Sequence, residues 1–409
     1  MKLWLKYVLG IILGIASVFI IPLDSPQAAA ILDFLTEIFT RFGRYALLPV
    51  LFFGAGIAVF KLRDGGFMAL SAFWIFVTLV LSSAILAALG TVGAILVKLP
   101  PLPISAERSI SEVSISVKDL VMRVFPQSPF SALLEGTFLL PCFVFGGAVG
   151  GACATDKTAS KQAVGVLESF SCVAYSMLCF FSDMMTIGIM ALSCRWAINF
   201  SSVLKAGVYM PLIVMLTVNL LLVAFVLYPL LLRLVCHDPR PYKVLYASLC
   251  PFLTGFFTGD TNLTLLLSMR HGKDSLGIRR RMNAVSFPIY SIFARGGSAL
   301  VTSICFVTIL RTYSYLEIGF STTLWIGVMS FLLSFVLCSF STGGPFIALT
   351  IMCTMYGRGF ASGFLLLRPA SAIICAYAAG LDALSAMFGS YIIAVKTGTI
   401  EHRATKQFI

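Results

Sequence analysis

The amino-acid sequence predicts an all-α integral membrane protein, and three observations carry this prediction. Of the 409 residues, 59% are hydrophobic and 11% are charged, far from the roughly 25% charged residues of an ordinary soluble domain. Several nearly uncharged stretches exceed the about 20 apolar residues that a helix needs to cross a bilayer. The basic residues behind the net charge of +12 are spread over short loops, so we expect a lipid bilayer and no nucleic acid as partner.

The first half of the chain predicts six plain spans. The first segment also resembles a signal peptide, because Lys2 and Lys6 precede an apolar run and small residues follow it at 27–30. That run is longer than the roughly 7 to 15 residues of a signal core, so we expect a retained span. The six spans lie near residues 3–21, 33–60, 67–97, 130–152, 165–194 and 204–235.

The second half contains two interrupted apolar runs. The run 245–268 is broken by Thr258 to Asn262, and the run 323–356 is broken by Ser339 to Pro345. Two kinked helices would explain the breaks, because Gly and Pro are common in membrane helices. We favour two re-entrant hairpins, since each polar break is followed by another span and paired interruptions are typical of a transporter's binding site.

The basic loops predict the orientation of the chain. Lysine and arginine collect in cytoplasmic loops of membrane proteins, whereas the loop 98–125 mixes both signs and is expected on the opposite side. We therefore expect a multi-pass protein of the cell inner membrane with both termini in the cytoplasm. The basic loops contain Lys2, Lys6, Lys61, Arg63, Lys157, Lys161, Arg240, Lys243, Arg270, Lys273, Arg279, Arg280, Arg281, Lys396, Arg403 and Lys406.

The sequence does not predict an enzyme. Asp156 rather than glycine precedes Lys157 and Thr158, so the glycine-rich stretch from Gly146 lacks phosphate-loop spacing, and its glycines are expected to pack helices. Cysteines without metal-ligand spacing predict free thiols. We place the histidines in basic loops, which argues against an imidazole relay or metal site in the membrane. The histidines are His237, His271 and His402.

Four ionisable residues fall inside apolar segments, where each costs at least about 2.5 to 3.5 kcal/mol and therefore requires a partner or a task. They are Asp183, Asp260, Arg295 and Asp382. Asp183 is expected near a membrane interface in a structural role. Asp260 lies at the first break, where freed amides and a helix N-terminus hold anionic groups, although capping of a half-helix is an equally simple role.

Arg295 and Asp382 have neighbours that permit close approach. Arg295 precedes Gly296 and Gly297, and its guanidinium can clamp a carboxylate with two hydrogen bonds. An ion pair with Asp260 or Asp382 is the structural alternative. Asp382 suits an amine, a cation or a proton, or a pairing with Arg295 or Arg368. The predicted substrate site comprises Asp260, Thr261, Asn262, Arg295, Gly296, Thr342, Gly343, Gly344 and Asp382, and no metal ligands are assigned.

Several motifs, in order along nearly the whole chain, resemble the dicarboxylate/amino acid:cation symporter family, which includes the glutamate transporters. The stretch 126–133 is similar to the family's Pro-x-Asn-Pro-Phe motif before the fourth span, and 257–265 is similar to its first hairpin tip. The seventh-span motif corresponds to 287–300, the second hairpin tip to 339–345, and the end of the eighth span to 394–397.

The resemblance implies a glutamate-transporter-like fold of eight transmembrane helices plus two re-entrant hairpins. It also implies a homotrimer in which a transport core moves like an elevator against a fixed scaffold, with substrate between the hairpin tips and spans seven and eight. Residues 1–125 would then form spans one to three, and 126–244 spans four to six. Residues 245–409 would form the transport core with hairpin one, span seven, hairpin two and span eight.

The chain departs from the family at its functional positions. The family's seventh-span motif is Asn-Met-Asp-Gly-Thr, and the corresponding residues 294–298 of this chain are Ala-Arg-Gly-Gly-Ser. The chain therefore lacks the amide and the carboxylate that help to hold sodium in the family. In span eight, small or apolar residues replace the polar ones that hold the substrate and sodium in the family. They are Ala376, Ala379, Gly380, Ala383, Ala386 and Met387.

These departures leave the coupling ion open between sodium and protons. Arg295 can supply permanently the charge of a bound sodium, since opposite charges 4 Å apart interact by about 4 kcal/mol at an effective dielectric constant near 20. Protonation of Asp260 or Asp382 would instead couple transport to protons. The sequence thus predicts a secondary transporter, a symporter or an exchanger, for a small amino acid or dicarboxylate. An anion channel or leak, or a non-transporting scaffold with a decayed site, is the alternative.

Overall fold

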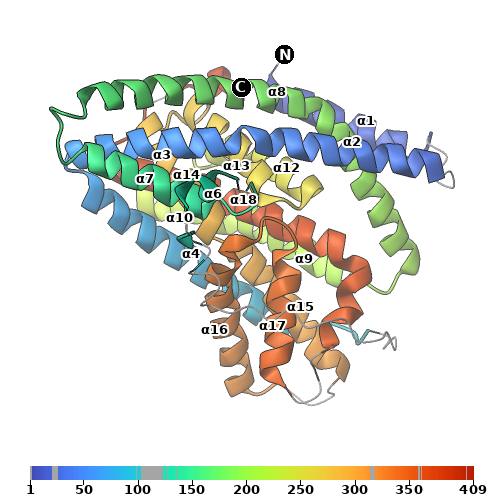
Figure 1. Ribbon diagram of the computed structural model, residues 1–409. Helices are drawn as coiled ribbons and strands as arrows, with labels where there is room; N and C mark the ends of the chain where they lie inside the picture. Colours follow the sequence, from blue (N-terminus) through green and yellow to red (C-terminus); the bar gives the residue numbers. More distant parts are fainter. Residues whose placement is uncertain are drawn as a thin grey trace.

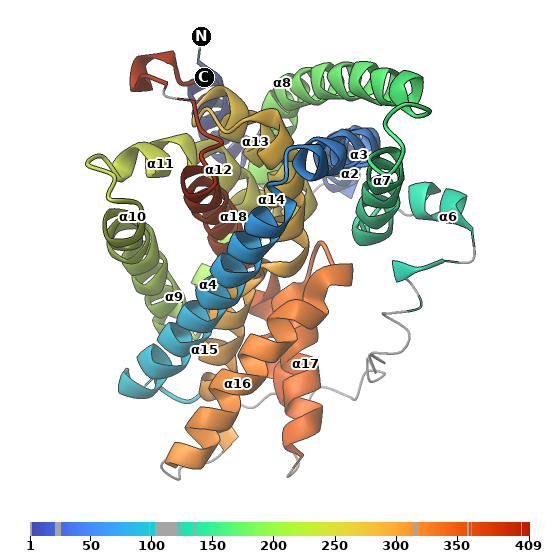
Figure 2. The same ribbon diagram turned by 90° about the vertical axis from the view of Figure 1, so that its left-hand side faces the viewer.

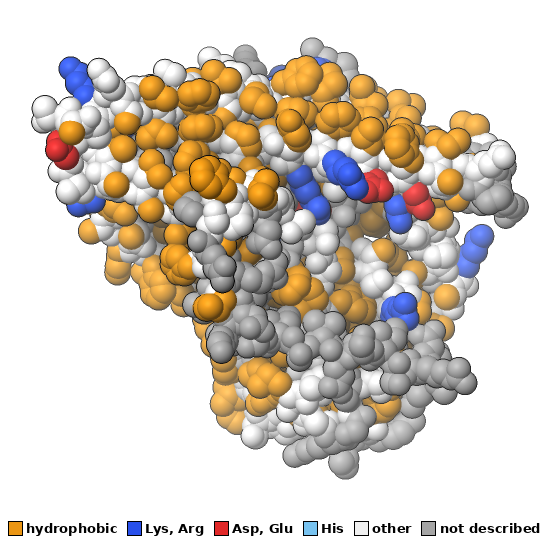
Figure 3. All heavy atoms as spheres, viewed as in Figure 1, with side chains coloured by type: hydrophobic (Ala, Val, Ile, Leu, Met, Phe, Trp, Pro, Cys, Tyr) orange, Lys and Arg blue, Asp and Glu red, His pale blue; other side chains and the backbone are white. Residues whose placement is uncertain are grey.

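The computed structural model describes residues 2–20, 26–97, 99–102, 122, 124–126, 128–134, 136–313, 318–357, 360, 362–401 and 403–409. Regular structure in these ranges is helical, apart from one isolated antiparallel bridge between Ile278 and Ile400. Seven helices within them are long and apolar enough to cross a membrane. Hydrophobic side chains are spread over the face in Figure 3 and charged ones are few, as expected for a protein in contact with lipid. The all-helical membrane class is therefore confirmed.

The helices of the first half differ in length from the predicted spans (Figure 1). The first is helical only to Ser17, which gives 15 residues, too few to cross a bilayer upright. The fifth extends to 46 residues. These helices are α1 (Leu3–Ser17), α2 (Pro26–Tyr45), α3 (Leu47–Asp64), α4 (Met68–Leu96), α6 (Pro129–Leu134), α7 (Leu140–Cys153), α8 (Lys161–Ala206), α9 (Met210–Leu222), the π-helix η1 (Val223–Leu227) and α10 (Tyr228–Cys236).

The second half is built from shorter helices, because its apolar runs are broken by polar and glycine residues. Breaks fall at Gly259 and Asp260, at Ala294 and Arg295, and at 340–343. The helices are α11 (Tyr242–Ala247), α12 (Leu249–Thr258), α13 (Thr261–Asp274), α14 (Arg280–Phe293), α15 (Gly296–Tyr313), α16 (Phe320–Val336), η2 (Leu337–Ser339), α17 (Gly344–Tyr356), η3 (Gly363–Ala370), α18 (Ser371–Lys396) and η4 (Thr405–Gln407).

Both predicted interruptions are sharp reversals of the chain. Gly259 ends α12 at φ +65° and Gly343 precedes α17 at φ +71°, conformations that favour glycine. A Cβ on Gly255 would lie 2.8 Å from Cγ2 of Thr264, so α12 and α13 pack directly against each other. Figures 1 and 2 show α16 and α17 side by side in the same way. The breaks therefore form two helical hairpins, and the kinked-helix interpretation is wrong.

Helix α18 is the central packing element of the molecule. It is buried along nearly its whole length and contacts α4, α12, α13, α14 and α15. Gly389 lets Tyr290 of α14 approach, since a Cβ there would lie 2.2 Å from the tyrosine ring. Tyr228 of α10 stacks on Phe388 at 4.8 Å between ring centroids. Helix α18 also contacts α17, so both hairpins and both halves of the broken α14–α15 helix pack against one element.

The remaining long helices form a second unit beside this core. Helix α3 packs on α7 and α8, and α8 also packs on α1 and α2 (Figures 1 and 2). We call 3–64 with 140–206 the peripheral group, and 68–96 with 249–396 the core group. They meet where α3 packs on α14 and where α8 packs on α12, α13 and α18. The first helix and the C-terminal residues share one end of the molecule, since Trp4 and Phe408 both pack on Tyr246.

Of the glycines predicted to pack helices, Gly146 and Gly150 do so in the peripheral group, whereas Gly147 and Gly151 have only loose contacts. A Cβ on Gly150 would lie 1.9 Å from the carbonyl oxygen of Gly56, and one on Gly146 would lie 2.5 Å from that of Phe52. Both obstacles are backbone atoms, which cannot rotate aside. Helix α7 therefore depends on glycine to reach α3.

Replacing Gly150 with valine should destabilise the protein by about 1 to 3 kcal/mol, because α7 must move away from α3. The thermal unfolding temperature of the purified protein in detergent measures this loss. Gly165→Val is the matched control, since Gly165 is also helical but has no atom within 4 Å of its added Cβ. Equal losses from the two variants would contradict the packing role of Gly150.

Candidate functional site

The tips of the two hairpins touch each other inside the core group. The backbone N–H and the Oγ1 of Thr261, the first residue of α13, donate to the carbonyl oxygen of Ser341 at 3.1 and 3.2 Å. Both residues are buried. Segments 80 residues apart in the sequence thus form one closed polar junction in an apolar protein.

Asp260 completes this junction from the first hairpin. Its Oδ1 accepts the backbone N–H of Asn262 at 2.9 Å and so caps α13. Its Oδ2 accepts from Nε and Nη2 of Arg44 in α2, at 3.0 and 2.6 Å. Arg44 Nη2 also reaches Oγ of Ser341 at 3.3 Å. Asp260 therefore has the capping role that we gave as the alternative to substrate binding and, in addition, joins the hairpin tips to the peripheral group.

Sequence reasoning missed Arg44, although the signal was present. Arg44 lies within the apolar segment predicted for 33–60, where the cost of a charge in the membrane requires an explanation. Its partner is 216 residues away, so pairing could not be read from local spacing. Arg44 also borders a cavity of about 660 Å³, together with Arg41, Tyr45 and Thr137. The cavity therefore borders the hairpin junction on the side of Arg44.

Arg295 lies at the break between α14 and α15, where the helix opens to admit its side chain. Arg295 is 3% exposed, and its Nη2 donates to the carbonyl oxygen of Phe340 in the second hairpin tip at 2.5 Å. Nε is buried without a hydrogen-bond partner in the described part of the chain. The predicted ion pairs with Asp260 and Asp382 are absent among the described residues, because each carboxylate is held by other groups.

Asp382 is fixed to the start of α15. Its two oxygens accept the backbone N–H of Ser298 at 3.1 Å and the Ser298 hydroxyl at 2.7 Å. The positive end of the α15 dipole further stabilises this carboxylate. Gly297 permits the approach, since a Cβ there would lie 2.8 Å from Oδ1. No basic side chain within the described ranges forms an ion pair with Asp382, Arg368 included.

Of the other predicted site residues, two lie at the second hairpin tip and three face elsewhere. Gly343 forms the turn before α17, and Gly344 lies near Ser298, since its added Cβ would be 3.7 Å from the Ser298 hydroxyl. In contrast, the amide of Asn262 donates to the carbonyl of Thr137, away from the second hairpin. Gly296 faces Leu86 of α4, and Thr342 is exposed.

The loop predicted to carry Arg270, His271 and Lys273 is wrong. All three residues lie in α13, and His271 is 2% exposed, because the buried apolar residues before them carry the helix on to Asp274. Asp183 has the structural role that we expected, in an ion pair with Arg270 at 3.3 Å. The described ranges contain no group of three His, Cys, Asp or Glu side chains that could hold a metal ion.

Comparison with known proteins identifies the family. The model of the sodium:dicarboxylate symporter family matches residues 3–395. The chain belongs to this family of membrane symporters. The predicted family membership is confirmed, and so is the prediction of a transporter instead of an enzyme, because the family consists of secondary symporters.

The relatives of the symporter that are named for a substrate are distant. The chain is 24% identical over 366 residues to the serine/threonine transporter SstT of Streptococcus agalactiae serotype III, covering 87% of this chain and 85% of the relative. It is 25% identical over 310 residues to SstT of Lacticaseibacillus paracasei, covering 74% and 68%. The symporter is thus a distant relative of serine/threonine transporters.

The ion pair between Arg44 and Asp260 should be energetically coupled, because Asp260 is almost completely buried. We expect a coupling energy of about 1 to 3 kcal/mol in a double-mutant cycle of Arg44→Gln and Asp260→Asn, read from thermal unfolding. Arg41→Gln is the control, since Arg41 pairs with Glu37 at exposed fractions of 78% and 63% and should change stability little. Additive losses from the two single variants would refute the pairing.

Proposed function

We propose that this symporter carries a small amino acid with an uncharged side chain, and that Arg295 holds the substrate's carboxylate. The observation that carries this proposal is a guanidinium buried in the core group, beside the second hairpin tip, without a carboxylate in contact in the described part of the chain. A buried cation of this kind is costly unless an anion joins it. Arginine also matches a carboxylate with two parallel hydrogen bonds.

The balance of charge favours an amino acid over a dicarboxylate. The residues around the hairpin junction contain two guanidiniums, Arg44 and Arg295, and two carboxylates, Asp260 and Asp382. A zwitterion leaves this formal charge at zero, whereas a dicarboxylate would add two negative charges in a desolvated site. Asp382 keeps lone pairs that can accept from an ammonium group. The names of the distant relatives, serine/threonine transporters, agree with this choice.

We further propose an elevator movement of the core group against the peripheral group. The two groups meet where α3 packs on α14 and where α8 packs on α12, α13 and α18, and the Arg44 to Asp260 ion pair spans the same boundary. A sliding core must break this ion pair in each cycle. Arg44 therefore belongs to the conformational machinery in this proposal, whereas Arg295 belongs to the substrate site.

The membrane arrangement that we propose has eight spans and two re-entrant hairpins, with both termini in the cytoplasm. Helices α12 and α17 support the two hairpins, since 10 and 13 residues are too short to cross a bilayer. Helix α1, with 15 residues, is counted as the first span from the family resemblance and not from its length. A homotrimer is proposed from the family resemblance. Apolar side chains exposed on α2 and α8, among them Phe34 and Ile187, offer a surface for subunit contact.

The charge of Arg295 suggests how this member differs in its use of sodium. The resemblance places a sodium-binding motif of the seventh span at 294–298, where this chain has arginine in place of the amide and carboxylate. We propose that the fixed guanidinium supplies the positive charge that sodium supplies there in relatives. Substrate affinity should then not depend on sodium at this position.

Arg295→Gln should abolish saturable uptake of labelled serine or threonine, whereas Arg44→Gln should retain it. Only the first variant removes the guanidinium that binds the substrate's carboxylate in this proposal. Removing such a charged partner costs about 2 to 5 kcal/mol, which corresponds to a loss of roughly 30-fold or more in affinity. The measurement is counterflow into proteoliposomes, with succinate and aspartate as competitors.

Four outcomes would count against the proposal. Full counterflow by Arg295→Gln would show that the carboxylate binds elsewhere, and stronger competition by succinate than by threonine would replace the amino acid with a dicarboxylate. Non-saturable flux without counterflow would favour an anion channel. Equal loss in both variants, with normal folding shown by gel filtration, would mean that Arg295 and Arg44 do not have the separate roles proposed.

A further inference from the structure

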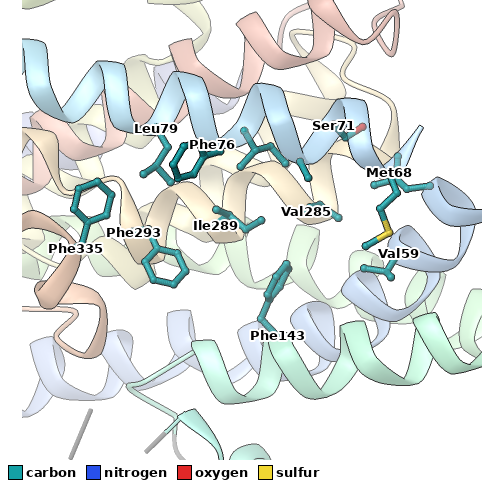
Figure 4. Close-up of a pocket in the computed structure, with 13 residues that line it drawn as sticks. Val59, Met68, Ser71, Phe76, Leu79, Phe143, Val285, Ile289, Phe293 and Phe335 are labelled. Atoms are coloured by element: carbon teal, nitrogen blue, oxygen red, sulfur yellow. The ribbon is translucent and has the colours of Figure 1, made fainter. Parts of the chain in front are cut away.

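An apolar groove with a volume of about 430 Å³ lies between the peripheral group and the core group. Figure 4 shows that Val59 of α3 and Phe143 of α7 form one wall, while residues of α4 and α14 form the other. The groove also reaches Phe335 of α16. It is separate from the hairpin junction, and neither the proposed substrate nor a coupling ion has a use for so apolar a surface.

The shape of the groove matches one acyl chain in one leaflet. Val285, Ile289 and Phe293 line it at four-residue intervals along α14, and Arg281 lies one further interval before them. Residues four apart share a helix face, and at about 1.5 Å per residue the row from Arg281 to Phe293 is about 18 Å long. This is close to half of the roughly 30 Å hydrocarbon thickness of a bilayer.

A basic side chain, Arg281, lies just beyond the end of the groove near Met68, although it does not line the groove itself. The guanidinium of Arg281 lies over the ring of Phe67 at 5.5 Å, directly beside Met68, and its Nε is buried without a hydrogen-bond partner in the described ranges. Its neighbours are engaged with protein groups: Arg279 pairs with Glu401 at 3.5 Å, and Arg280 donates to Ser171. Arg281 is the arginine of this triplet that remains available to an external anion.

Two further features call for an anion at this end. Three successive arginines at the N-terminus of α14 oppose the positive end of its helix dipole, an arrangement that a bound anion relieves. Glu168 lines a small adjoining cavity with Arg280 and Arg281, but its carboxylate is paired with Lys61. The charge of Arg281 is therefore not neutralised by the nearby acid.

We propose that the groove binds an anionic phospholipid, with an acyl chain along α14 and the headgroup phosphate on Arg281. Basic pockets between membrane helices recognise such headgroups in general, and charge complementarity together with the length of the groove favours a lipid over a peptide or a second subunit. Because the groove lies between two groups that slide in the proposed mechanism, the lipid fills the boundary along which the core moves. The binding itself rests only on the groove and Arg281, and not on the substrate.

The test is lipid binding to the full-length protein, delipidated in detergent and measured by native mass spectrometry. Phosphatidylglycerol and phosphatidylcholine with identical acyl chains are compared. We expect one phosphatidylglycerol per chain to bind about tenfold more tightly than phosphatidylcholine, and Arg281→Gln to remove this preference. Ala72→Phe, which places a ring in the groove, should weaken both lipids. Arg233→Gln is the control for loss of one exposed positive charge in α10.

The comparison of the two phospholipids uses the wild-type protein. It therefore tests the proposal even where a substitution impairs folding. Equal binding of the two phospholipids would mean an adventitious acyl chain only and would overturn the proposal. A preference for phosphatidylglycerol that survives Arg281→Gln but is lost in Arg233→Gln would place the headgroup elsewhere. Loss of transport by Arg295→Gln leaves this result unaffected, so the lipid proposal and the proposed function fail separately.

Discussion

The buried hydrogen bond from Arg295 to the carbonyl of Phe340 is the interaction on which the rest of the site depends. It places the second hairpin tip against the break between α14 and α15. That tip presents the carbonyl of Ser341 to Thr261, and so positions the first hairpin. Asp260, at the end of this chain of contacts, is bound by Arg44 of the peripheral group. A chain of polar contacts that begins at Arg295 and ends at Arg44 thus links both hairpins, the broken helix and the boundary between the two groups.

Features that are local in the sequence could be predicted from it. The breaks at 258–262 and 339–345 were visible because polar and glycine residues interrupt apolar runs, and Arg295 was visible because a charge in such a run needs an explanation. The packing of Gly146 and Gly150 follows from helical spacing. Membrane class and hairpin positions therefore came from composition and pattern alone.

Features that depend on distant partners could not be predicted. The ion pair of Arg44 with Asp260 and the capture of Asp382 by Ser298 join residues 216 and 84 positions apart, and these two pairings leave Arg295 without a carboxylate contact in the described ranges. The orientation of Asn262 towards Thr137 is likewise set by packing. His271 was misplaced because polar residues around it conceal a helix whose other faces are buried.

The central claim is that Arg295 takes the electrostatic place of a bound sodium ion. The most direct test is the affinity of the purified wild-type protein for labelled threonine, measured with sodium chloride and with choline chloride at equal ionic strength. The account predicts dissociation constants that agree within about twofold, a difference of about 0.4 kcal/mol. Binding that tightens tenfold or more in sodium would show that a sodium ion still completes the site, and would contradict the account.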